Sequence, residues 1–419
     1  MVKYQLLDTF KYSIDESVIS RTDGVEAEYQ RRINGYSTVV TRMYPKLFKS
    51  EEKNGTKDPL FFVETLDVNG LISQIYRKSA EITNLNNDIP GVARNSFINT
   101  LLVNEIKYTN EIEGVETDSE EIGTIVGDLD NNQGRRLAST INLYLDTLKQ
   151  KVVKINSLSD IRSLYDGLLK GEISERKLPD GLLFRNGPVR IGTQFETYHQ
   201  PPISEAEINV ALSSLIDFMN DPDLDPILKA VVSHFVFENT HPFYDGNGRT
   251  GRYLISAYLA SKVDVLTGLS LSNAIRNSSS KYYKAFRTAS KLSNRADVTQ
   301  FIQDMLLIIL AGQNDVIENL TDKKNVLNTV SLNIKRHTED VIERRVLDLL
   351  AQSQLFNATL SMSISDNDII EALHNKGVAK AKVKRYLKQL EDENEIVQTL
   401  GRPLKHKISM PFWTKLTEE

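Results

Sequence analysis

The chain has 419 residues, a net charge of −5 at pH 7 and no cysteine. Its length predicts about two to three domains, because one hydrophobic core rarely serves so long a chain. The lack of cysteine excludes disulfides, thiolate nucleophiles and cysteine-ligated zinc or iron–sulfur sites. The mildly acidic balance does not favour a protein that coats nucleic acid or anionic membranes as a whole.

The longest apolar run, residues 305–311, is too short to cross a bilayer and predicts a buried helix instead. The first residues show no basic stretch followed by an apolar one, so we expect no signal peptide. A chain without cysteine also fits a reducing compartment. We therefore expect a cytoplasmic protein that makes no membrane contact.

Apolar residues recur mostly at helical spacing and rarely alternate, which predicts a mainly α fold. Residues 1–90 are mixed and polar, with a turn-rich stretch at 50–59 followed by two short helical candidates. A strong helix is predicted from about residue 91 to residue 113, where Gly114 can end it. Further helices are predicted at roughly 117–130, 133–150, 158–170 and 203–219.

One β-hairpin is predicted over residues 181–192. Two short alternating runs flank the dipeptide Asn186-Gly187, which is typical of a hairpin turn. Pro188 places the second run at a sheet edge, because proline cannot donate a hydrogen bond to a ladder.

A helix that is apolar on nearly all sides follows at about residues 226–239, which indicates that it is buried in the middle of a domain. Asp225 can cap its N-terminus, and Pro226 suits its first turn. The next helix is predicted at about residues 249–262, and the helical pattern continues to about residue 335.

The pattern changes near residue 340, after which three helices and a strand–turn–strand predict a winged-helix module. A basic stretch precedes the first acidic residue of its last helix, Glu391, and consists of Lys376, Lys380, Lys382, Lys384, Arg385 and Lys388. Such a helix can enter a DNA major groove. A solvated face or a protein-docking surface fits the same pattern equally well.

The loop between the two core helices and the start of the second helix, residues 241–252, read HPFYDGNGRTGR. Gly246, Asn247 and Gly248 can turn several backbone N–H groups into a concave anion-binding nest at a helix N-terminus. The string also matches the dinucleotide-binding pattern G-x-G-x-x-G. That pattern follows a helix here rather than a strand, which argues against a dinucleotide-binding fold.

Charged groups around this nest complete a set of parts for displacement at phosphorus. Arg249 and Arg252 stand three apart on one helix face, where two cations oppose the helix dipole unless an anion lies between them. Asp245 is a hard oxygen ligand suited to Mg²⁺. His241 can act as a general base near neutral pH. Each feature alone is usually structural, so the prediction depends on their occurring together.

The complete string resembles the signature of Fic-domain proteins: His, any, Phe, any, Asp or Glu, Gly-Asn-Gly-Arg, two free positions, Arg. Every specified position is present, and chance produces such a match roughly once in 10^10 windows. The resemblance covers roughly residues 95–310 and implies a Fic-type helical bundle with a small β-hairpin flap. The expected organisation is an N-terminal region at 1–90, a Fic core at 91–320, a linker helix at 321–339 and a winged-helix domain at 340–419.

The resemblance implies a protein adenylyltransferase, which transfers AMP from ATP to a Ser, Thr or Tyr hydroxyl of a protein, itself included. It implies that His241 deprotonates the hydroxyl, that Asp245 holds Mg²⁺ and that Phe243 anchors the loop. Relatives that transfer phosphocholine or phosphate depart at the Gly-Asn-Gly-Arg segment, which is intact here. The implied phosphate-binding residues are Gly246, Asn247, Gly248, Arg249 and Arg252.

The segment TNEIEG, from Thr109 to Gly114, resembles the inhibitory motif of the same family. The resemblance implies that Glu113 pairs with Arg252 and denies that arginine to the γ-phosphate of ATP. In some relatives the same glutamate positions water that removes AMP, so a de-AMPylase is one alternative. A nucleotide-sensing DNA-binding regulator is another, against which the intact His241 argues, because a sensor needs no base.

The resemblance also implies partner sites. The predicted hairpin corresponds to the family's flap, where Val189, Arg190 and Ile191 would register the target chain by strand addition, although an ordinary edge hairpin fits as well. Tyr282 and Tyr283 stand where relatives line the adenosine pocket, and relatives often form homodimers. No motif surrounds the other five histidines, which we expect to be structural or exposed: His199, His234, His337, His374 and His406.

Overall fold

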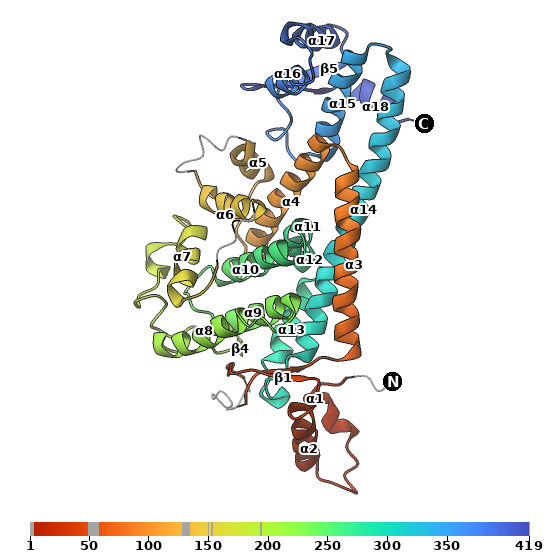
Figure 1. Ribbon diagram of the computed structural model, residues 1–419. Coiled ribbons are helices and arrows are strands. Elements are labelled where there is room, and N and C mark those ends of the chain that lie inside the picture. The colour runs from red at the N-terminus through yellow and green to blue at the C-terminus, as the bar shows by residue number, and fades with distance from the viewer. Residues whose placement is uncertain are drawn as a thin grey trace. The chain divides into compact units, whose positions relative to one another are not determined.

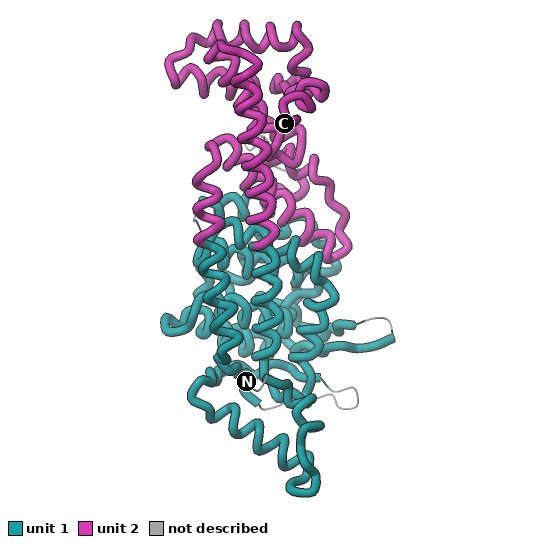
Figure 2. Tube along the Cα trace, turned by 90° about the vertical axis from the view of Figure 1, so that its right-hand side faces the viewer, with its two compact units in different colours: residues 1–79, 142–313 teal, residues 80–141, 314–419 magenta. Residues whose placement is uncertain are grey.

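The computed structural model describes residues 4–48, 58–127, 135–149, 151, 154–192 and 195–418. Helices dominate these residues, and the strands among them form three two-stranded antiparallel sheets (Figure 1). The predicted mainly α fold is therefore confirmed. The contacts divide the chain into two compact units, residues 1–79 with 142–313 and residues 80–141 with 314–419 (Figure 2).

The first unit holds most of the helices and two of the strand pairs. Its helices are α1 (Leu7–Phe10), η1 (Lys11–Ser13), α2 (Arg21–Ile33), α7 (Leu158–Leu168), η3 (Glu175–Lys177), α8 (Glu205–Met219), α9 (Pro226–Thr240), α10 (Asn247–Lys262), α11 (Val265–Leu269), α12 (Leu271–Asn277), α13 (Ser279–Ala289) and η4 (Leu292–Asn294). Its strands are β1 (Thr38–Val40) paired with β2 (Phe61–Val63), and β3 (Ile191–Gly192) paired with β4 (Thr197–His199). Three helices are divided between the two units: α3 (Leu66–Asp88), α6 (Ala138–Leu148) and α14 (Thr299–His337).

The core of the first unit is built around α9, which is buried along almost its whole length, as its composition predicts. Helices α8 and α10 pack against it (Figure 1). The Asp225 carboxylate caps α9 by accepting from the backbone N–H of Ile227 at 2.8 Å. At the other end His241 adopts the left-handed conformation, with φ 49°, so the chain leaves the helix through a sharp turn.

The predicted hairpin over 181–192 is wrong. Residues 181–190 form no strand, and the observed pair lies further along the chain, between β3 and β4. The backbone N–H groups of the segment have other partners, because the Glu205 carboxylate accepts from Leu182, Leu183 and Phe184. The segment is therefore a loop held by side chains, which local turn signals do not reveal.

The two short helices predicted after residue 59 are also wrong, because a single helix of 23 residues, α3, takes their place. Val68, Ile72 and Ile75 are buried at helical spacing, so one continuous apolar stripe holds the helix together. Most of the turn-rich stretch predicted at 50–59 lies outside the described residues.

The second unit contains the remaining helices and the third strand pair. Its elements are α4 (Gly91–Ile112), α5 (Ser119–Gly127), α15 (Val341–Phe356), α16 (Asp366–His374), α17 (Lys380–Asp392), β5 (Ile396–Gly401), β6 (Leu404–Ile408) and α18 (Met410–Thr417). Helix α4 ends as predicted, with Glu113 as its C-cap and Gly114 at φ 71°. Helix α18 is an addition that the sequence pattern did not predict.

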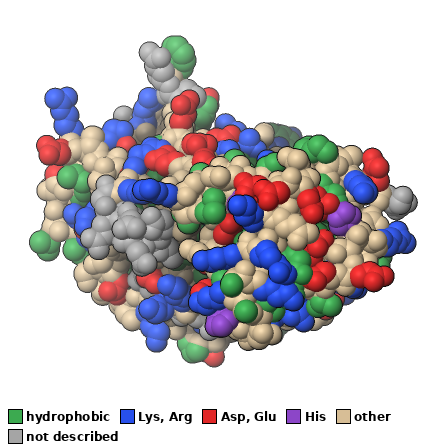
Figure 3. All heavy atoms as spheres, turned by 90° about the horizontal axis from the view of Figure 1, so that it is seen from above, with side chains coloured by type: hydrophobic (Ala, Val, Ile, Leu, Met, Phe, Trp, Pro, Cys, Tyr) green, Lys and Arg blue, Asp and Glu red, His purple; other side chains and the backbone are tan. Residues whose placement is uncertain are grey.

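Helix α17 buries Val383, Tyr386, Leu387 and Leu390, which leaves its lysines and Arg385 exposed. Figure 3, seen from the side on which α17 lies in Figure 1, shows Lys and Arg side chains gathered on that face. Among the described helices, none has both the length and the apolar composition needed to cross a bilayer.

Candidate active site

The loop between α9 and α10 is closed by its own side chains and backbone. The Asn247 carboxamide accepts from the Phe243 N–H at 2.9 Å and donates to the Phe243 carbonyl at 2.8 Å. Gly246 lies in the left-handed region at φ 81°, and a Cβ atom there would collide with Leu169. Glycine is therefore required on both backbone and packing grounds. The loop ends at the N-terminus of α10, where the first backbone N–H groups have no hydrogen-bond partner within the helix.

Phe243 anchors this loop in the core, as the resemblance implies. Its side chain is fully buried, and its ring stacks on Tyr165 with the centroids 3.7 Å apart. Phe184 packs on it with a centroid distance of 5.6 Å. Two aromatic neighbours on a fully buried ring fix the position of the chain that connects His241 to Asp245.

Arg185 supports the same loop, and the sequence analysis missed it. Its side chain is fully buried and donates from Nε to the His241 carbonyl at 2.8 Å and from a terminal nitrogen to the Thr240 carbonyl at 3.3 Å. Burial lowers the pKa of Arg185 to about 10, which still leaves the group charged at neutral pH. An arginine in an alternating run is expected to face solvent, so no local signal marked it.

His241 is positioned to accept a proton. Its side chain keeps 24% of its surface exposed, and Nδ1 lies 3.9 Å from a Glu238 carboxylate oxygen. Burial lowers the pKa of His241 to about 3, and the charges of His199 and Arg185 act in the same direction. The imidazole is therefore neutral at pH 7 and able to accept a proton, but a pKa this far below neutrality makes it a weaker base than an unperturbed histidine.

The two arginines of the loop motif lie in the first turns of α10 and are both buried, with Arg252 1% exposed. Arg249 pairs with Glu172 at 2.7 Å, and the two side chains are 7% and 8% exposed. The motif alone predicts an anion beside these arginines. It does not identify Glu172, which follows α7 and is far from the motif in sequence.

Asp245 makes an ion pair with Lys177 at 2.6 Å, and both groups are partly exposed. Because solvent reaches Asp245, a Mg²⁺ ion can replace the Lys177 ammonium group beside its carboxylate. Asp245 is therefore a fitting donor for Mg²⁺, although Lys177 competes for the same oxygen.

The other predicted residues lie outside this loop. Tyr282 on α13 is buried, and its hydroxyl lies 2.8 Å from His234 Nε2, whereas Tyr283 is 46% exposed. Thr109 and Glu113 stand at the end of α4 and belong to the second unit, whereas the loop belongs to the first.

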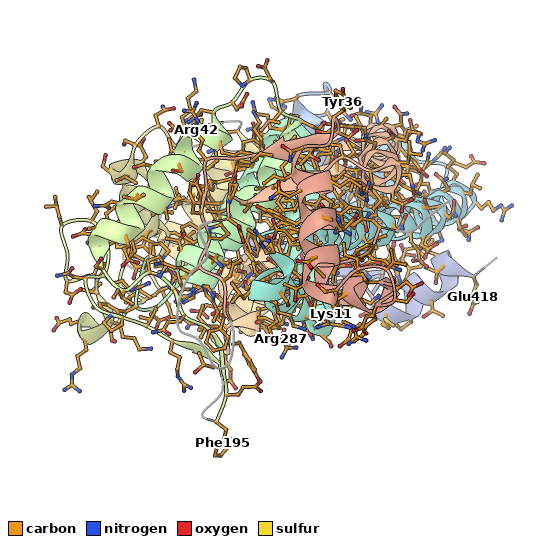
Figure 4. All side chains as sticks on the ribbon, turned by 90° about the horizontal axis from the view of Figure 1, so that it is seen from below. Lys11, Tyr36, Arg42, Phe195, Arg287 and Glu418 are labelled. Carbon is orange, nitrogen blue, oxygen red and sulfur yellow. The ribbon has the colours of Figure 1, made fainter. Side chains whose placement is uncertain are left out.

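The predicted flap residues Val189 and Arg190 precede β3, whose first residue is Ile191. They line a groove of about 1100 Å³, together with Asp8, Lys11, Phe48, Pro188, Phe195, Glu196, Thr197, Tyr198, Gln200, Arg287, Ser290, Lys291, Leu292 and Ser293. The Arg287 guanidinium lies 5.0 Å from the centre of the Tyr198 ring. Figure 4 shows Phe195 projecting away from the helices, and its side chain is 93% exposed.

The model of the Fic/DOC family matches residues 155–259, which include the whole loop motif. Residues 155–259 are therefore similar to a Fic domain. Protein adenylyltransferase fic-1 of Caenorhabditis elegans is 33% identical over 109 residues, which are 23% of this chain and 22% of the relative. Probable protein adenylyltransferase aq_aa38 of Aquifex aeolicus (strain VF5) is 34% identical over 128 residues, 30% of this chain and 35% of the relative.

The chain thus spans between 22% and 35% of the length of these two curated relatives. Among solved structures, a Fic family protein from Desulfovibrio desulfuricans G20 is similar with a TM-score of 0.49 and 19% identity. That similarity covers 83% of this chain and 97% of the other chain.

Proposed function

We propose that this protein transfers AMP from ATP to a Ser, Thr or Tyr hydroxyl of a protein. The observation that carries the proposal is the loop after α9, which brings a neutral histidine, a solvent-accessible carboxylate and two buried arginines to one helix N-terminus. The names of the curated relatives, protein adenylyltransferases, support the same reaction.

In the proposed reaction His241 accepts the proton of the target hydroxyl. The hydroxyl oxygen bonds to the α-phosphorus, and the bond from that phosphorus to the α,β-bridging oxygen breaks, so pyrophosphate leaves. The N–H groups at the start of α10 bind the phosphates, with Arg249 toward the β-phosphate and Arg252 toward the γ-phosphate. Asp245 would hold Mg²⁺, which neutralises charge on the phosphates when bound.

Glu113 is proposed to restrain this activity by pairing with Arg252. The sequence motif from Thr109 to Gly114 supports the proposal, as does the position of Glu113 at the C-terminal end of α4. The helix dipole does not stabilise a carboxylate at that end, so a basic partner elsewhere would stabilise the charge of Glu113. De-AMPylation through the same glutamate remains the second candidate reaction.

The target chain is proposed to add to β3 and to continue along the groove beside the flap. Strand addition needs a free strand edge, and β3 pairs with β4 alone among the described strands. Homodimer formation and DNA binding by the basic face of α17 remain predictions from the sequence.

The test uses ATP labelled at the α-phosphate, Mg²⁺ and four forms of the purified chain: wild type, Glu113→Gly, Glu113→Gly with His241→Ala, and Glu111→Gly. The last is a matched control, because it changes an acidic residue of the same helix end. We expect weak label in the wild type and in Glu111→Gly, strong label in Glu113→Gly and none in the double variant. Absence of label from every form, with cell lysate as target, would contradict transfer, and release of AMP from modified protein would then be measured.

A further inference from the structure

Three side chains of the second unit, outside the candidate active site, converge where α14, α15 and β5 meet. His337 is the last residue of α14, Glu343 lies in the first turn of α15, and Glu395 immediately precedes β5. One ligand atom from each, an imidazole nitrogen and two carboxylate oxygens, lie within 4.8 Å of one another.

One buried oxygen of this cluster has no hydrogen-bond partner among the described residues. His337 Nε2 lies 2.8 Å from Glu395 Oε1. The second oxygen of Glu395, Oε2, is buried and has no hydrogen-bond partner among the described residues. Glu343 is only 9% exposed, and its carboxylate has no hydrogen bond or ion pair with any described residue. Buried polar groups without partners are rare in proteins and call for an explanation.

The charges of the cluster favour binding of a cation. Glu343 and Glu395 bring two carboxylates to within 4.8 Å of each other, and His337 is the one basic side chain in the cluster. A protonated His337 would balance one carboxylate and leave the second uncompensated. Two carboxylates at this separation repel each other unless a proton or a cation lies between them.

We propose that His337, Glu343 and Glu395 bind a divalent transition-metal ion, with water completing its coordination. One nitrogen and two oxygen donors favour ions such as Zn²⁺ or Mn²⁺, whereas Mg²⁺ and Ca²⁺ select oxygen ligands. The His337 ring packs against Phe412 with centroids 4.7 Å apart, which orients it. The side chain keeps 24% of its surface exposed, so an ion and its water can enter from solvent.

The ion would join the end of α14 to α15 and β5. These elements belong to the predicted linker helix and winged-helix module, so metal binding would stiffen that unit. The site is independent of the proposed AMP transfer, because none of its residues belongs to the loop after α9.

The test titrates ZnCl₂, and separately MnCl₂ and MgCl₂, into the chelator-treated full chain by calorimetry. We expect one Zn²⁺ per chain, an affinity lowered about tenfold or more in both His337→Ala and Glu343→Gln, and weaker binding of Mg²⁺. His374→Ala is the matched control, since His374 is an exposed histidine of the same unit. Asp245→Asn is the second control, because it removes the carboxylate proposed for Mg²⁺. Both controls should keep the wild-type affinity.

X-ray absorption at the zinc edge gives an independent readout. We expect one imidazole and several oxygen ligands at about 2.0–2.2 Å. Glu343→Gln nearly preserves the shape of the side chain, so it decides the outcome even if His337→Ala fails to fold. The proposal is overturned if the wild type binds no Zn²⁺ at micromolar concentration. It is equally overturned if both variants bind as the wild type does, or if binding is lost only in a control.

Discussion

Arg185 donates from Nε to the carbonyl oxygen of His241 at 2.8 Å, from a side chain that has no exposed surface. Its terminal nitrogens donate to the carbonyls of Gly187 at 2.6 Å and Thr240 at 3.3 Å. These partners are backbone carbonyls rather than carboxylates, so the cation is buried against the negative ends of peptide dipoles. The backbone that carries the candidate base is thus held by a residue from the loop before β3.

Replacing Arg185 with methionine should therefore lower stability and misplace His241. The variant leaves buried carbonyls without donors, and we expect a loss of about 2–4 kcal/mol in the free energy of unfolding, measured by urea denaturation. In the Glu113→Gly background, AMP transfer should fall more than ATP affinity. Arg190→Met, at an exposed position nearby, is the control for the stability measurement alone, because Arg190 is also a proposed flap residue. Equal stability of the two variants would show that the carbonyl contacts do not matter.

Gly246 and Gly171 form a natural pair for testing the start of α10. Both are in the left-handed region, but a Cβ atom at Gly246 meets Leu169 whereas one at Gly171 meets nothing within 4 Å. We expect Gly171→Ala to cost about 1–2 kcal/mol from backbone strain alone. Gly246→Ala should cost more and should also weaken ATP binding, as calorimetry would reveal. Identical costs would mean that the loop relaxes away from Leu169.

The Arg249–Glu172 pair places a carboxylate where the proposed function requires a phosphate. Glu172→Gln keeps the shape of the side chain and removes its negative charge. We expect ATP and pyrophosphate to bind roughly 3- to 10-fold more tightly, because Arg249 is no longer neutralised by a buried partner. Glu175→Gln, a nearby acidic residue on η3, should leave the affinity unchanged. Weaker binding in Glu172→Gln would instead assign Glu172 the task of orienting Arg249.

The three histidines of the first unit predict a loss of stability in mild acid. Burial lowers the pKa of His199 to about 4 and the pKa values of His234 and His241 to about 3. Because the unfolded chain titrates near pH 6.5, it binds more protons than the folded chain below that pH, so stability is full above pH 6.5 and falls as pH decreases. Each histidine should cost about 1 kcal/mol between pH 6.5 and 5.5.

His406, in the second unit, changes stability with pH in the opposite direction. Its hydrogen bond to Asp366 raises its pKa, so its contribution is present below pH 6.5 and is lost as pH rises through the folded pKa. The net change should still be a loss, which denaturation at pH 7.5, 6.5 and 5.5 measures. The lower pH limit avoids the range in which carboxylates titrate. Stability that stays constant over this range would mean that the three histidines are protonated in the folded chain.

Local patterns in the sequence predict several features of the fold. Helix α9 was predicted because its apolar residues, the cap at Asp225 and the proline after it are contiguous in the chain. The end of α4 was predicted because a glycine after an apolar period is a local signal. The hairpin prediction is wrong because a residue distant in sequence decides the local structure. Glu205 accepts the N–H groups that a hairpin with its turn at Asn186-Gly187 would have paired between strands.

The sequence by itself determined the helical class, the loop motif from His241 to Arg252 and the chemistry that this motif can perform. These properties depend on residue type and on spacings of a few residues, both of which can be read from the sequence. Only the tertiary structure decided that Arg185 supports His241, that Glu172 pairs with Arg249 and that His337 meets Glu343 and Glu395. Burial and pairing of these groups come from segments distant in sequence, and the free energy that brings them together belongs to the packed core rather than to any one segment.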